Sequence, residues 1–249
     1  MQSNHQDAGI RALFVADCHF HVRRHPDEAR RWERFIAWLD QAAGVEQLVL
    51  LGDIFDFWFD YPHFRMKGYE PLLRALDRVR AAGTRLHFVG GNHDIWAARY
   101  LHQRHGTEPA AGPLTLTLDG RRVHCLHGDG LFGRDLLYQA FRGIVRHPAG
   151  VWCAKALHPE VLFTLSTWLS GTSRHCTRDE VVEIERKAAR WLARQQQATW
   201  DHLIIGHVHH PHTAVHGDRR LSSLGGWLDD LNYGCWRDGR FEHRRFPAA

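Results

Sequence analysis

Short apolar segments that end beside glycine and an acidic, amide or imidazole side chain recur along this chain. Two intervening segments place apolar side chains at helical spacing and stop at Gly44 and Gly83. This order of strand, helix, strand, helix and strand predicts an α/β fold with a mainly parallel sheet and right-handed crossovers. The predicted strands are residues 10–16, 47–51 and 84–89, and the predicted helices are residues 28–43 and 71–82.

The second half of the sequence has a different pattern. Asp119-Gly120 supplies the positive φ angles of a two-residue turn, so residues 114–118 and 121–126 predict a β-hairpin. Residues 131–200 carry helical patterns. Further strands are expected at residues 203–205, 213–215 and 221–224 and on both sides of Asp238-Gly239. Two sheets with flanking helices follow from this mixture.

The length of 249 residues is that of one large domain or of a domain with an insertion. Between His127 and His207 lie 79 residues, more than one crossover needs. We therefore expect a catalytic domain formed by residues 1–130 and 178–249, and a helical cap inserted as residues 131–177.

Composition excludes several classes of protein. A content of 44% hydrophobic and 24% charged residues excludes disorder. The net charge of +4 is too small to imply a nucleic-acid partner, and we expect none. Five cysteines without C-x-x-C spacing suggest neither a disulfide framework nor a thiolate zinc site. Residues 1–9 lack the apolar core of a secretion signal, and no apolar run is long enough to span a membrane. We expect a cytoplasmic protein that can touch a membrane peripherally.

Groups of metal-ligand type follow the predicted strands, at the strand ends where α/β folds assemble their sites. Alone, each group has an ordinary explanation: Gly-Asp is usually a turn, and Asn92 or Asp94 can cap a helix. Five such groups in order favour a site. They are Asp17-x-His19, Gly52-Asp53-x-x-Asp56, Gly91-Asn92-His93-Asp94, His127-Gly128-Asp129 and Gly206-His207-x-His209.

The types of ligand indicate the chemistry. In an extended chain, two ligands separated by one residue point to the same side, so each such pair is expected to chelate one ion. Two divalent ions about 3.5–4 Å apart need a bridging carboxylate, imidazoles and an oxygen donor, and they can activate water for attack on phosphorus. Nitrogen and oxygen ligands without sulfur favour manganese, iron or zinc over calcium.

Together these groups resemble the calcineurin-like metallophosphoesterase superfamily. The resemblance implies a four-layer αββα sandwich with two divalent metal ions, for which we expect Mn²⁺. It also implies that Asp53 bridges the ions and that Asp56 and Asp94 orient the ligands. The implied ligands are Asp17, His19, Asp53 and His209 for one ion, and Asp53, Asn92, His127 and His207 for the other.

Further segments resemble the family of UDP-2,3-diacylglucosamine pyrophosphohydrolases of the lipid A pathway. The segments are residues 52–58, 127–129, 138–142, 207–211 and 224–227. The implied reaction hydrolyses the pyrophosphate of this nucleotide-sugar lipid to UMP and 2,3-diacylglucosamine 1-phosphate. His93 departs from that family, which has arginine there, but matches the leaving-group acid of the wider superfamily. The implied catalytic residues are His93, His207 and Asp53, and the implied substrate-binding residues are Asn92, His93, Asp135, Ser173, Arg174 and His207.

The expected cap carries two apolar helical stripes with arginines among them. It is either an ordinary helical hairpin or a lid that takes acyl chains and meets an anionic bilayer surface, the cytoplasmic face of the inner membrane. Three other functions compete with the lipid reading. The first is a phosphoesterase for another nucleotide or phosphodiester. The second is a metal-free scaffold, in which some of the metal-ligand residues should be absent from the sequence. The third is a nuclease, which should carry a strip of basic residues.

Overall fold

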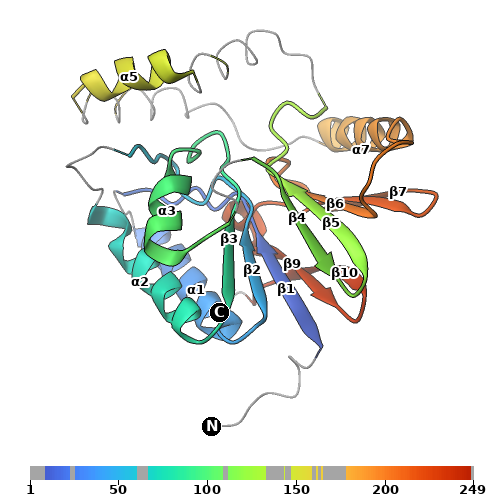
Figure 1. Cartoon of the computed structure of the whole chain (residues 1–249), viewed down its shortest axis with the longest axis horizontal. Helices are drawn as coiled ribbons and strands as arrows, with labels where there is room; N and C mark the ends of the chain where they lie inside the picture. Colours follow the sequence, from blue (N-terminus) through green and yellow to red (C-terminus); the bar gives the residue numbers. More distant parts are fainter. Residues whose placement is uncertain are drawn as a thin grey trace.

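The chain forms two stacked β-sheets with helices on both outer faces (Figure 1). The first sheet has the strand order β10-β9-β1-β2-β3, and the second has the order β4-β5-β6-β8-β7. These statements concern the part of the chain that the computed structural model describes, which is residues 9–22, 26–60, 67–108, 112–132, 143, 147–158, 161, 164 and 178–247.

The first sheet begins with the predicted crossover units. Strands β1, β2 and β3 pair in parallel, and α1 and α2 connect them, the second after the short 3-10 helix η1 (Lys67–Tyr69). The prediction of alternating strands and helices is confirmed here. The C-terminal hairpin completes this sheet, because β9 pairs antiparallel with β1. The bounds are β1 Ile10–Val15, α1 Pro26–Ala42, β2 Gln47–Leu50, α2 Glu70–Ala81, β3 Arg85–Phe88, β9 Asn232–Arg237 and β10 Arg240–Arg245.

The second sheet is built around the expected hairpin. Asp119 and Gly120 have φ angles of 47° and 75°, which is the turn that the Asp-Gly pair predicts. Strand β5 then pairs in parallel with β6, which pairs in parallel with β8. The bounds are β4 Leu114–Leu118, β5 Arg121–Leu126, β6 His202–Ile205, β7 His212–His216 and β8 Arg219–Ser223.

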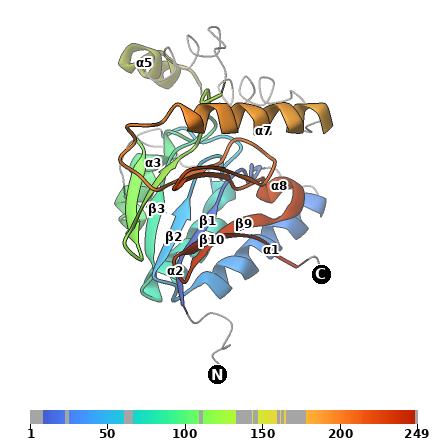
Figure 2. The ribbon, with the colours of Figure 1, turned by 90° about the vertical axis from the view of Figure 1, so that its right-hand side faces the viewer.

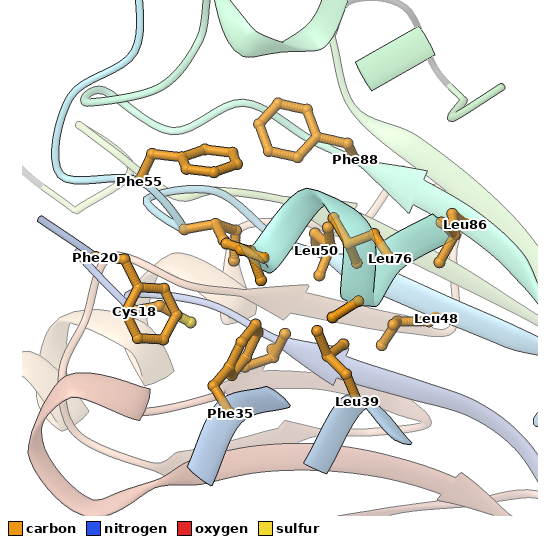
Figure 3. Packing of buried hydrophobic residues seen from close by; sticks show 14 of the residues in the cluster. Cys18, Phe20, Phe35, Leu39, Leu48, Leu50, Phe55, Leu76, Leu86 and Phe88 are labelled. Carbon is orange, nitrogen blue, oxygen red and sulfur yellow. The ribbon is translucent and has the colours of Figure 1, made fainter. Parts of the chain in front are cut away.

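Alternation along the strands produces the layers. On β1, Leu13 and Val15 pack toward α1 and α2, whereas Ala12 and Phe14 pack between the two sheets. Helix α7 (Arg178–Ala193) covers the outer face of the second sheet, on the opposite side of the molecule from α1 (Figure 2). Figure 3 shows the aliphatic side chains of β2 beside those of α1 and α2. The chain therefore has the expected four-layer αββα arrangement.

Two helices were not predicted. Helix α3 (Ala97–His105) follows the Gly91–Asp94 loop, and α8 (Trp227–Asp230) follows β8. Within the expected cap, the structure describes α5 (Pro148–Ala156), whereas Asp135, Ser173 and Arg174 lie outside the described residues. No helix in the described ranges is long and apolar enough to cross a membrane.

The buried His202 predicts a loss of stability in acid. Burial, with Arg220 nearby, lowers its pKa to about 4, and its Nε2 lies 2.8 Å from the hydroxyl of Ser222. The pKa of a histidine in an unfolded chain is about 6.5. Between this pKa and the folded pKa of about 4, the unfolded state therefore binds a proton that the folded state excludes. The contribution of His202 to stability is therefore complete above about pH 6.5 and is lost as the pH falls toward the folded pKa of about 4.

We expect His202→Gln to reduce this pH dependence. Glutamine can still bond to Ser222 but does not titrate, so the free energy of unfolding should fall less steeply between pH 6.5 and 4.5 than in the unmodified protein. Urea unfolding at a series of pH values measures this, with the exposed His216→Gln as control. Parallel curves for all three proteins would contradict the assignment.

Candidate metal centre

Loops that follow β1, β2, β3, β5 and β6 bring their carboxylate, amide and imidazole side chains together at one edge of the two sheets. Because these strands pair in parallel within each sheet, their carboxyl ends meet there. Among the described residues, three groups have ligand atoms within 4.8 Å of one another. The groups are Asp17, His19 and His209; His19, Asp53 and His93; and Asp53, His127 and His207.

Asp53 lies at the middle of the cluster and belongs to two of the groups. Its Oδ2 is 3.3 Å from Nε2 of His127, 3.7 Å from Nε2 of His19 and 4.0 Å from Nε2 of His93. The amide oxygen of Asn92 lies 3.2 Å from the same Nε2 of His127. Asp53 is therefore the carboxylate in the position that a bridging ligand requires.

The backbone of the ligand loops is not extended, which corrects one expectation. Asp17, His19 and His207 have φ angles of 52°, 45° and 63°, in the left-handed region that residues other than glycine seldom occupy. The chain turns at His207, so His207 groups with Asp53 while His209 groups with Asp17. This grouping differs from the expectation that strand alternation alone gives for His207 and His209, and it agrees with the division between two ions that the family resemblance implies.

Hydrogen bonds from ring nitrogens to backbone carbonyls orient two of the imidazoles, those of His127 and His93. Nδ1 of His127 lies 2.9 Å from the carbonyl oxygen of Leu51, and Nδ1 of His93 lies 2.8 Å from that of Asp56. A carbonyl oxygen only accepts, so each Nδ1 donates its N–H to that carbonyl and the bond fixes the orientation of the ring. Both Nε2 atoms face Asp53. Metal-ligating histidines are commonly held by such contacts.

His209 is oriented by a carboxylate that the sequence analysis did not identify. Its Nδ1 lies 2.7 Å from Oδ2 of Asp229 in α8, and its Nε2 faces Asp17. A Cβ atom at Gly226 would lie 2.5 Å from the same Asp229 oxygen, so this contact requires glycine there. Asp229 follows the Leu224-Gly225-Gly226-Trp227 segment. The two adjacent glycines in that segment were the sequence signal that could have pointed to a close contact there.

Asp94 holds the Asp53 loop in place. Its buried carboxylate accepts backbone hydrogen bonds from Asp53, Ile54, Phe55 and Gly91, at 2.8–3.2 Å. A Cβ atom at Gly91 would lie 2.1 Å from Oδ1 of Asp53, so only glycine permits this approach.

Asp56 contacts a histidine beside the cluster. Its Oδ2 lies 3.0 Å from Nδ1 of His21, and its Oδ1 lies 3.7 Å from Nδ1 of His19. Asp94 therefore supports the Asp53 loop and Asp56 lies beside His19, and the orienting role of both carboxylates stays a prediction.

The electrostatics of the cluster favour a cation. Burial raises the pKa of Asp17 to about 7 despite the nearby His127 and His209. Burial also opposes ionisation of Asp53, but His127 and the other imidazoles outweigh it and hold the pKa of Asp53 well below its usual range. Oδ1 of Asp17 is buried and accepts no hydrogen bond from any described residue. A buried carboxylate oxygen that lies among imidazoles without accepting a hydrogen bond fits a divalent metal ion.

The predicted substrate contacts are partly present in this cluster. His207 is exposed at its edge, and the side chain of His93 is 17% exposed, so both are accessible to a ligand. The structure brings Asn92, His93 and His207 to the cluster, while Asp135, Ser173 and Arg174 lie outside the described residues.

Comparison with known proteins gives consistent similarities. The calcineurin-like phosphoesterase family model matches residues 10–211. UDP-2,3-diacylglucosamine hydrolase of Porphyromonas gingivalis is 26% identical over 246 residues, covering 90% of this chain and 92% of that protein. The hydrolase of the same name from Azotobacter vinelandii is 31% identical, covering 86% and 90%. That from Aeromonas salmonicida is 28% identical, covering 95% and 94%.

Asp229 provides a test of the centre that the sequence pattern alone did not suggest. Asp229→Ala removes the acceptor for Nδ1 of His209, so we expect metal affinity to fall by about 10- to 100-fold. Asp229→Asn keeps an oxygen acceptor and should lose less. Competition with a chromophoric chelator measures the affinity. The control is Asp230→Ala, because Asp230 pairs with Arg245 at the surface. Equal affinity in Asp229→Ala and Asp230→Ala would contradict the role of Asp229.

Proposed function

The chain belongs to the calcineurin-like phosphoesterase family and is a metal-dependent hydrolase, and from this premise we propose that it hydrolyses the pyrophosphate bond of UDP-2,3-diacylglucosamine. The products would be UMP and 2,3-diacylglucosamine 1-phosphate, which places the reaction in lipid A biosynthesis. Hydrolysis is supported by one observation, which is that three ligand groups converge at the strand ends. Two of these groups share Asp53.

We propose that two divalent ions, Mn²⁺ in the first instance, bind in this cluster. Bound ions of this kind lower the pKa of water toward neutrality and offset charge on phosphoryl oxygens. Asp53 would contribute to both positions, because it shares one ligand group with His19 and another with His127 and His207, and Asn92 would supply the neutral oxygen. The proposed ligands are Asp17, His19, Asp53 and His209 for one ion, and Asp53, Asn92, His127 and His207 for the other.

We assign His93 the role of proton donor to the leaving oxygen. Its backbone N–H donates to Oδ1 of Asp53 at 2.9 Å, and its Nδ1 is held by the carbonyl of Asp56. These two bonds fix the ring so that Nε2 faces the cluster. A protonated Nε2 there can transfer its proton once the oxygen lies within hydrogen-bond reach. His207 at the exposed edge would contact the phosphoryl oxygens.

The choice of substrate rests on the relatives, which bear the name of this hydrolase and match this chain over most of their length. We propose that residues 131–177 form a cap over the centre and that Asp135, Ser173 and Arg174 in it bind substrate. Acyl chains buried there would contribute about 0.8 kcal/mol per methylene.

We also propose a cytoplasmic location with peripheral contact to the inner membrane. In and after α5, Trp152, Leu157 and Val161 are 71%, 43% and 54% exposed. Exposed apolar side chains of this size suit contact with a lipid substrate or with the bilayer that contains it.

The purified protein should release UMP from UDP-2,3-diacylglucosamine. Activity should disappear on exhaustive chelation and return with Mn²⁺, because the proposed reaction depends on the ions. UDP-N-acetylglucosamine is the matched compound that has a short acetyl group and no long acyl chain, and it should be a poor substrate. Hydrolysis of a generic phosphodiester alone would assign another substrate to the same centre. Full activity after metal removal would contradict the proposed metal requirement.

His93→Ala should lower kcat while both ions remain bound, because His93 acts as proton donor in this mechanism rather than as ligand. His127→Ala is the comparison, and it should lose metal. Metal content by plasma mass spectrometry and steady-state kinetics give the two readouts. If His93→Ala lost an ion, His93 would be a ligand, as its group with His19 and Asp53 permits geometrically.

A further inference from the structure

The loop that carries Asp17 and His19 is buried and has a backbone conformation that needs support. Asp17, Cys18, His19 and Phe20 are at most 3% exposed. Asp17 and His19 both have positive φ angles. Non-glycine residues persist in this conformation only where surrounding contacts hold them in it.

Backbone donors serve most carbonyl groups of this loop. The carbonyl of Ala16 accepts from the N–H of Trp227 at 3.2 Å, and the carbonyl of Asp17 accepts from the N–H of Leu228 at 3.0 Å. The carbonyl of Phe20 accepts from the N–H of Asp56 at 3.1 Å. The two carbonyls between them, of Cys18 and His19, receive their hydrogen bonds from a side chain instead.

That side chain is Arg31 of α1. Its Nη1 donates to the carbonyl of Cys18 at 2.7 Å, and its Nη2 donates to the carbonyl of His19 at 3.3 Å. The guanidinium group also lies 5.1 Å from the ring centroid of Phe20. Its side chain is 11% exposed, so little water is available to replace these bonds.

Glu28 fixes the guanidinium from the other side. One of its oxygens pairs with Nη2 of Arg31. The other accepts from the N–H of His21 at 3.0 Å and from the indole N–H of Trp32 at 3.0 Å. From one turn of α1, Arg31 therefore binds the carbonyl groups of the loop and Glu28 binds the backbone N–H of His21 that follows it.

We propose that the Arg31–Glu28 pair is a positioning device for the metal centre, because it holds Asp17 and His19 in the conformation in which both face His209. The inference rests on the proposed function, since it assumes that these three residues hold an ion. It assigns a role to two residues of α1 that do not themselves belong to the ligand groups.

A simpler role for the pair is an ordinary ion pair three residues apart on a helix, which contributes little to stability. That role affects the helix and not the metal. The positioning role requires the planar fork of arginine, because one ammonium group cannot reproduce two fixed guanidinium donors to neighbouring carbonyls.

The test measures metal content, metal affinity and hydrogen exchange of the Mn²⁺-loaded protein. We expect Arg31→Gln to retain one ion firmly and to bind the other at least about tenfold more weakly. Hydrogen exchange in a peptide covering residues 17–20 should become faster. Arg31→Lys should show a smaller loss, and Glu28→Gln should behave like Arg31→Lys. These two variants carry the test if Arg31→Gln does not fold.

The matched control is Arg104→Gln. Arg104 also forms a partly buried network, with Glu70 and Asp77, but contacts no residue of the centre. The Arg104→Gln substitution should lower thermal stability without changing the number of ions bound. Two ions bound with unchanged affinity in the folded Arg31 and Glu28 variants would overturn the inference while the proposed function stands. Failure of the unmodified protein to bind two ions would overturn the proposed function instead.

Discussion

The contact between Asp53 and His127 joins the two sheets at the site, and the rest of the cluster depends on it. Asp53 follows β2 of the first sheet and His127 follows β5 of the second, with 3.3 Å between Oδ2 and Nε2. A buried carboxylate requires positive charge close by. Two further bonds cross the same junction, from Nδ1 of His127 to the carbonyl of Leu51 and from the N–H of His207 to Asp17.

The sandwich explains how such a cluster persists. Its ligand loops contain several residues with positive φ and a buried carboxylate oxygen without a hydrogen bond, and each of these features costs stability. Three apolar clusters, one beneath each helical layer and one between the sheets, offset that cost. The strained loops are thus confined to one edge of an otherwise regular structure.

The proposed function assigns hydrolysis and substrate choice to different parts of this chain. The groups that suit phosphoryl chemistry project from strand ends of the sandwich, and all of their residues lie within the range 10–211 that the family model matches. The proposed specificity belongs to residues 131–177, where α5 presents Trp152 at the surface. Under this proposal the sandwich supplies the hydrolytic centre and the inserted segment sets the substrate, as a fold can serve several phosphoesters.

The sequence by itself determined the alternating strands and helices, the Asp119-Gly120 turn and the identity of the residues that meet at the centre. These follow from local periodicity, from turn chemistry and from motifs that keep their order along the chain. The family resemblance already implied that His207 and His209 serve different ions, but only the tertiary structure showed the physical reason, which is a backbone turn at His207 that overrides strand alternation. It also revealed Asp229, since its contact with His209 joins residues 20 apart and depends on packing that no local pattern encodes.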